Sequence, residues 1–138
     1  MGTIAEDLDA LAEDFELLED WQDQLGYVID LGRALPRLDQ AERIDANKVR
    51  GCASQVWLVT ERTPDGRLTF RAESDAQIPH GLIAVLLKLY SGRRPEEIRE
   101  LDPQDAVARL KLESMLTSQR ANGLAAMVER IRREASKA

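Results

Sequence analysis

The chain has 138 residues and a formal net charge of −6, with 43% hydrophobic and 32% charged residues. A chain of this length suits one compact domain and can bury roughly two-thirds of its unfolded surface without a disulfide or a metal. The acidic balance argues against nonspecific nucleic-acid binding, which draws its affinity from basic patches. A single cysteine excludes an internal disulfide and leaves too few ligands for a zinc or iron–sulfur site made by one chain.

The N-terminal segment and the apolar stretches of the chain bear on its localisation. The segment MGTIAEDLDALAEDF has neither a basic leader nor an apolar run, so no secretory signal is expected. The apolar stretch 81–87 is too short to span a membrane. We therefore predict a cytoplasmic protein that binds no membrane and no nucleic acid.

The first expected element is acidic. Residues 1–20 contain eight acidic residues and no basic ones. Four apolar residues recur at helical spacing (Ile4, Leu8, Leu11 and Phe15), and Thr3 can cap the helix they predict. Within a single domain spanning residues 1–138, we expect residues 1–14 to form a mobile acidic helix that aids solubility. A surface that steers a basic partner is the alternative.

A second helix is predicted over about 20–34. Its apolar side chains recur at helical spacing, and Asp20 is the expected cap. Pro36 should stop it, because proline has no amide hydrogen and excludes the helical conformation from the residue before it.

The pattern then changes to that of strands. Residues 54–61, SQVWLVTE, are rich in β-branched and aromatic types. The T-P-D-G sequence at 63–66 suits a type I turn that closes a hairpin. In 67–73, apolar residues alternate with polar ones that include Glu73, which predicts a strand with one wet face. Lys48 and Val49 could add a short third strand.

The rest of the chain is predicted to be helical. Residues 78–90 are apolar almost all round, which marks a helix buried against the sheet. Pro95 and Pro103 each stand where a new helix can start. A last helix is expected over about 118–135. The predicted fold class is α+β, with a small antiparallel three-stranded sheet packed against several helices.

Cys52 is the main candidate for chemistry, because it follows Gly51 at the corner where a strand begins. A glycine there can permit a sharp corner that presents the sulfur. Free cysteines are often small buried hydrophobes, so the residue pattern alone leaves both interpretations open. His80 is the only histidine, and nothing in the sequence places it beside the thiol.

Four segments of the chain match a known family pattern in order. The sequence GCASQVW at 51–57 is similar to the signature G-C-x-S-Q-V-W of the SufE family, the sulfur acceptors of cysteine desulfurases. Three further segments resemble family segments: the W-x₅-YVIDLGRALP block at 21–36, HGLIAVLLKLYSGRRPEEI at 80–98 and LTSQRANGLAAM at 116–127. The resemblance covers about 15–135, with the blocks in the family order.

The resemblance implies a function. SufE-like proteins accept persulfide sulfur from a pyridoxal-phosphate cysteine desulfurase (SufS-like), stimulate it, and deliver the sulfur to an iron–sulfur scaffold complex. By this resemblance Cys52 is the acceptor nucleophile, and Gly51, Ser54 and Gln55 shape its site. Arg120 matches a family arginine that could stabilise a thiolate, or could form a salt bridge that anchors the last helix. No bound cofactor and no metal are expected, since the sulfur is carried covalently on the cysteine.

The sequence departs from the family pattern at three positions. Ser118 and Arg94 replace a common proline and a common helix-capping threonine. His80 stands where a basic residue is common, which weakens any catalytic role for it. None of these changes affects the cysteine.

Several alternatives stay open. One is a CsdE-type acceptor that feeds another sulfur pathway, and another is a desulfurase regulator that carries no sulfur. A cluster scaffold is a third, although it would need more cysteine or carboxylate ligands. The oligomeric state is also open, with a homodimer among the possibilities.

Overall fold

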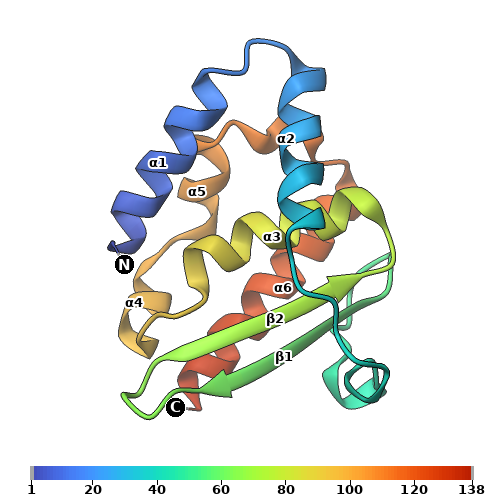
Figure 1. Cartoon of the computed structure of the whole chain (residues 1–138), viewed down its shortest axis with the longest axis vertical. Helices are drawn as coiled ribbons and strands as arrows, with labels where there is room; N and C mark the ends of the chain where they lie inside the picture. The colour runs from blue at the N-terminus through green and yellow to red at the C-terminus, as the bar shows by residue number, and fades with distance from the viewer. Residues whose placement is uncertain (1, 138) are drawn as a thin grey trace.

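A computed structural model describes residues 2–137 and shows six α-helices with a two-stranded antiparallel sheet (Figure 1). The elements in chain order are α1 (Ile4–Glu16), α2 (Trp21–Arg33), β1 (Val56–Arg62), β2 (Leu68–Ser74), α3 (Gln77–Tyr90), α4 (Pro95–Glu100), α5 (Pro103–Arg109) and α6 (Ser118–Ser136). Short 3₁₀ turns lie at Gln40–Glu42, Asp45–Asn47 and Leu112–Met115. Helix α3 runs through the middle of the molecule and contacts α1, α2, α6 and strand β2.

Helix α3 is the centre of the core, as its apolar sequence predicts. Nine of its 14 residues are buried. Glycines bring α2 very close to it: a methyl group at Gly32 would lie 3.0 Å from the Cα atom of Gly81. A methyl group at Gly81 would lie 2.5 Å from the carbonyl oxygen of Val28. The two helices can approach this closely only because neither glycine has a side chain.

The β1–β2 hairpin forms where the sequence predicts it. Gly66 N–H donates to the Thr63 carbonyl at 3.0 Å, and Gly66 has a φ of 86°, in the left-handed region that glycine tolerates. The expected third strand is not formed within residues 2–137. Lys48 makes only an isolated bridge with Trp57, because the chain turns away at once toward Gly51. The sheet therefore has two strands instead of three.

The outer edge of β2 is capped by α3 and the residues that follow it. Leu68 N–H donates to the Arg93 carbonyl at 2.8 Å, and Phe70 N–H donates to Ser91 Oγ at 2.9 Å. Ser74 N–H donates to His80 Nδ1 at 3.1 Å. These groups take the place of a neighbouring strand, so these three backbone donors at the edge have partners.

The sequence predicts that Glu73 lies on the solvent-exposed face of β2, and this is wrong. Glu73 is buried, with 7% of its surface exposed. Its carboxylate accepts a hydrogen bond from Leu38 N–H at 3.0 Å and lies 3.5 Å from Arg43 Nη1. The chain between α2 and β1 folds over this part of the strand. Alternation in sequence cannot show that a later-packed loop will cover the polar face.

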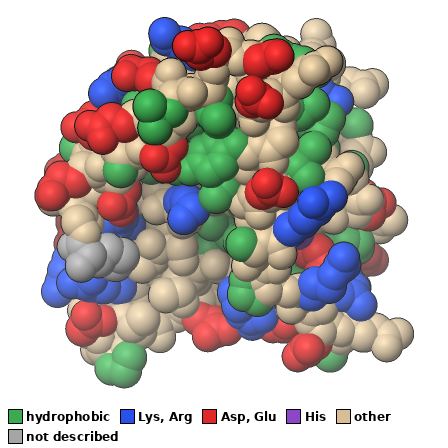
Figure 2. Space-filling model, turned by 45° about the horizontal axis from the view of Figure 1, so that its top comes forward, with side chains coloured by type: hydrophobic (Ala, Val, Ile, Leu, Met, Phe, Trp, Pro, Cys, Tyr) green, Lys and Arg blue, Asp and Glu red, His purple; other side chains and the backbone are tan. Residues whose placement is uncertain are grey.

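Helix α1 is packed on the molecule by its apolar side, with Leu11 and Phe15 buried. Thr3 and Glu6 form a capping box at its start. Arg93, only 2% exposed, pairs with Asp7 and donates to the carbonyl of Leu89. Acidic side chains gather over this part of the surface, around a hydrophobic patch (Figure 2). The mobility expected for 1–14 stays a prediction.

Candidate functional site

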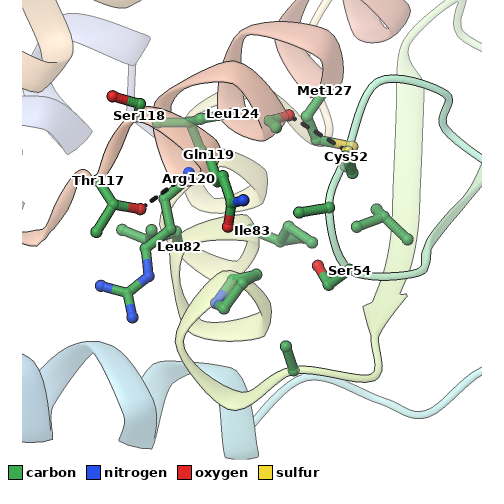
Figure 3. A pocket seen from close by; sticks show the side chains of 15 residues that line it. Cys52, Ser54, Leu82, Ile83, Thr117, Ser118, Gln119, Arg120, Leu124 and Met127 are labelled. Carbon is green, nitrogen blue, oxygen red and sulfur yellow. Dashed lines mark hydrogen bonds between the residues drawn. The ribbon is translucent and has the colours of Figure 1, made fainter.

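Cys52 lies between the Lys48 bridge and the start of β1, on the wall of a cavity of about 620 Å³. The Cys52 segment (residues 52–55), the start of α3 and the start of α6 enclose this cavity. Its apolar wall includes Leu82, Ile83, Leu124 and Met127 (Figure 3). The lone thiol is therefore half-buried beside an apolar hollow and does not project freely into solvent.

Two glycines shape the backbone around the sulfur. Gly51 has a φ of 92°, which produces the corner that the sequence predicts. Cys52 Sγ donates a weak hydrogen bond to the Gly123 carbonyl on α6 at 3.6 Å (Figure 3). A methyl group at Gly123 would lie 3.6 Å from Sγ, which is an ordinary van der Waals contact, so this turn of α6 lies directly beside the thiol.

Burial controls the ionisation of the thiol. Desolvation raises the pKa of Cys52 above its usual value, because a buried site disfavours the charged thiolate. The thiolate is the nucleophilic form of cysteine. In this half-buried arrangement of Cys52, which we call the closed conformation, the protonated and less nucleophilic form of the thiol predominates at neutral pH.

Polar contacts from the end of β2 fix the Cys52 segment. Gln55 N–H donates to Asp75 Oδ1 at 2.9 Å, and the Gln55 side-chain amide lies 3.4 Å from Asp75 Oδ2. Ser74 Oγ donates to Ser54 Oγ at 3.3 Å. Ser54 lines the cavity, whereas Gln55 does not and is held beside it by Asp75. Ser74 and Asp75 are two partners that sequence reasoning missed. The only signal for these partners was a pair of polar residues at the strand end.

Arg120 lines the same cavity but does not contact the thiol. Its Nη1 donates to the Met115 carbonyl at 3.1 Å, and its backbone N–H donates to the Thr117 cap at 3.2 Å. Its guanidinium points away from Cys52, with Gln119 between them (Figure 3). Within residues 2–137 Arg120 forms no ion pair, so the expected salt bridge is not formed there, and a role in stabilising the thiolate stays a prediction.

The described residues hold no cluster of three or more His, Cys, Asp or Glu side chains that could bind a metal ion. His80 accepts a hydrogen bond from the Ser74 backbone and makes no hydrogen bond to the thiol in this part of the chain. The site therefore offers one nucleophile, an apolar hollow and a segment held by polar contacts.

Comparison with known proteins shows to which family the chain belongs. The family model described as SufE, the Fe-S metabolism associated domain, matches residues 9–135. The chain belongs to the SufE family. An uncharacterised SufE-like protein of Rhizobium meliloti is 48% identical over 131 residues, which cover 93% of this chain and 94% of that protein. One of Rhizobium etli is also 48% identical over 131 residues, covering 93% of this chain and 88% of the other.

The fold is shared more widely than the sequence. The solution structure of a hypothetical protein from Thermus thermophilus superposes with a TM-score of 0.77 at 18% identity. The match covers 95% of this chain and 94% of that one. Membership of the SufE family connects the chain to iron–sulfur metabolism and sulfur transfer. Across residues 2–137, no helix combines the length and the apolar character that a membrane span needs.

Proposed function

We propose that this SufE-family protein accepts sulfur on Cys52 from a pyridoxal-phosphate cysteine desulfurase, stimulates that enzyme, and delivers the sulfur to an iron–sulfur scaffold complex in the cytoplasm. The observation that carries the proposal is a lone cysteine, in the family signature, on the wall of an apolar cavity. Family membership over residues 9–135 supports the sulfur-transfer class.

The chemistry needs only one nucleophile. The Cys52 thiolate attacks the terminal sulfur of the donor persulfide, and the sulfur–sulfur bond of the donor breaks. The donor cysteine leaves as a thiolate, and Cys52 becomes a persulfide. The exchange has no net oxidation and no second co-reactant, and it follows the rules of thiol–disulfide exchange. The residues around Cys52 need only set exposure and ionisation.

The closed conformation supports storage of the sulfur. The cavity beside Cys52 has an apolar wall and room for one more sulfur atom. Because the thiol is half-buried and its pKa is raised, reaction with oxidants and small thiols in solution is slowed. A partner that opens the Cys52 segment would expose and ionise the thiol at the moment of transfer.

The test is a sulfur-transfer reaction with a cysteine desulfurase and free cysteine, followed by mass spectrometry of the intact protein. We expect Cys52 to gain one sulfur atom and desulfurase turnover to rise. Cys52→Ser should lose both effects and keep its fold, which circular dichroism would check. A Cys52→Ser protein that still stimulates turnover fully would support a regulator that carries no sulfur and contradict the proposal.

A CsdE-type acceptor would give the same result in that assay. Presenting the sulfur-loaded protein to an iron–sulfur scaffold complex separates the two. We expect sulfur to leave Cys52 and clusters to form on the scaffold when iron is supplied. Retention of the sulfur on Cys52 would contradict the delivery step while leaving acceptance intact.

A further inference from the structure

The junction between β2 and α3 contains a buried serine with two polar neighbours. Ser74 is the last residue of β2, pairs in register with Val56 of β1, and is 9% exposed. Its backbone N–H donates to His80 Nδ1 at 3.1 Å. A backbone donor this deeply buried needs a partner, and here a side chain on α3 supplies it.

The hydroxyl of Ser74 connects the same junction to the cysteine. It donates to Ser54 Oγ at 3.3 Å and accepts from Ala76 N–H at 3.2 Å. Ser54 stands two residues after Cys52 and lines the same cavity. One serine thus joins His80, on the helix, to the Cys52 segment.

Helix packing fixes the imidazole on its other side. A methyl group at Gly32 of α2 would come within 3.1 Å of His80 Cδ2. The ring is therefore confined between α2 and the end of β2. Nδ1 can accept the Ser74 N–H only when it carries no proton, so the neutral ring bears its proton on Nε2.

We propose that His80 is a positioning residue for Cys52. By accepting the Ser74 N–H, His80 fixes the end of β2 and the direction of the Ser74 hydroxyl. That hydroxyl holds Ser54, and with it the closed position of the thiol. That His80 aids sulfur transfer rests on the proposed function. That His80 restrains the Cys52 segment does not depend on it.

A direct acid–base role for His80 does not fit the geometry. Cys52 Sγ donates a hydrogen bond to the Gly123 carbonyl, and His80 Nδ1 accepts one from the Ser74 N–H. A general base must lie within hydrogen-bonding reach of the proton it takes. His80 acts on the thiol only through Ser74 and Ser54.

The first experiment measures how fast iodoacetamide alkylates Cys52 in the folded, full-length protein, with mass spectrometry as the readout. His80→Leu removes the acceptor and weakens the closed position. We expect alkylation to become roughly two- to tenfold faster, the change that corresponds to the loss of one hydrogen bond. His80→Asn places an oxygen acceptor near the Nδ1 position and should restore the slow rate. Gln77→Ala, on the exposed first turn of α3, is the matched control and should leave it unchanged.

A second variant keeps the test decisive if His80→Leu folds poorly. Ser54→Ala removes the other end of the connection and should also speed alkylation. In the double variant with His80→Leu, the fold-increase in the alkylation rate should be smaller than the product of the increases in the two single variants, because both substitutions act through Ser74. Multiplicative effects would contradict the proposal. So would an unchanged alkylation rate in a folded His80→Leu protein, or a His80→Asn protein that stays fast.

A desulfurase assay separates this inference from the proposed function. If docking requires the Cys52 segment to open, a looser segment lowers the concentration of protein that gives half-maximal stimulation. The rate at saturation should stay unchanged in His80→Leu, and the half-maximal concentration should fall by the factor seen in alkylation. A lower saturating rate with an unchanged half-maximal concentration would overturn the positioning role. A wild-type protein that takes up no sulfur would instead refute the proposed function and leave the alkylation result standing.

Discussion

The contact between α2 and α3 and the Cys52 segment are built in opposite ways. The helix contact is apolar and closely packed: Gly81 has no space for even a methyl group, and Gly32 could hold one only if its neighbours shifted. The segment is held by Gly51 at positive φ, a weak sulfur hydrogen bond and a few polar contacts to the end of β2. Close packing resists displacement, because every shift loses many contacts at once.

The difference separates the tasks of the two regions. The helix pair provides a fixed platform for the cavity wall and for His80. The segment that carries the thiol depends on individually weak interactions, so a partner can release it for little free energy. The proposed function, in which Cys52 is hidden and then presented to a partner, needs both kinds of region.

The largest effect should come from the helix contact. Gly81→Ala forces its new methyl group to 2.5 Å from the Val28 carbonyl oxygen, so the helices must separate. We expect a loss of about 3 kcal/mol in the free energy of unfolding, measured by urea denaturation. The control is Gly26→Ala on α2, where no atom apart from the adjoining backbone of the helix lies within 4 Å of the new carbon. It should gain up to about 1 kcal/mol from helix propensity. Equal effects at the two sites would refute the close-contact account.

Gly51→Ala tests the corner before the cysteine. An alanine at a φ of 92° is strained, and its methyl group would lie 3.3 Å from Ala126 Cβ. We expect a loss of about 1 to 2 kcal/mol, which is smaller than at Gly81, together with faster alkylation of Cys52. An unfolding free energy equal to that of the wild type would show that the corner can relax without cost.

Asp75→Ala should release the segment with little effect on global stability. It removes the acceptor of the Gln55 N–H, and Gln55 is exposed, so water can replace the lost partner. We expect native-state hydrogen exchange at Gln55 to become faster, with the unfolding free energy reduced by about 1 kcal/mol or less. Asp75→Asn keeps an oxygen acceptor and should change both quantities less. If the alanine variant were as unstable as Gly81→Ala, the distinction between the two regions would fail.

The smallest effect concerns pH. Burial raises the pKa of Cys52 in the folded protein, so the folded state keeps its proton while the unfolded chain loses it. The stability from this group is therefore complete below the pKa of the unfolded thiol, about 8.5. It is lost as the pH rises through the pKa of the folded state. We expect the midpoint of the alkylation rate against pH to lie higher for the folded protein than for the same protein in urea. Coincident midpoints would contradict a desolvated thiol.

The elements of the fold were predictable because their ends are marked locally. Thr3 and Asp20 cap helices as expected, and each side-chain oxygen accepts a backbone N–H of the first turn. Asp102 caps α5 in the same way. Pro95 and Pro103 start α4 and α5. Such signals involve residues a few positions apart, so one sequence is enough to detect them.

The site was predictable only in part, because its contacts join distant segments. Cys52 and the Gly51 corner could be identified from the sequence. The thiol, however, donates a hydrogen bond to the carbonyl of Gly123, which lies 71 residues away in the chain. No local pattern shows that Arg120 would turn to the Met115 carbonyl, away from the sulfur. The missing third strand has the same origin, since pairing beyond Lys48 depends on where the Gly51 corner sends the chain.

The capped edge of β2 also bears on self-association. A two-stranded sheet has two edges, and an open edge is a template on which another chain can add a strand. Arg93, Ser91 and His80 already engage N–H groups of Leu68, Phe70 and Ser74 along the outer side of β2. A foreign strand would have to break these bonds before it could pair there. The same contacts that complete the sheet therefore protect this edge against pairing with another chain.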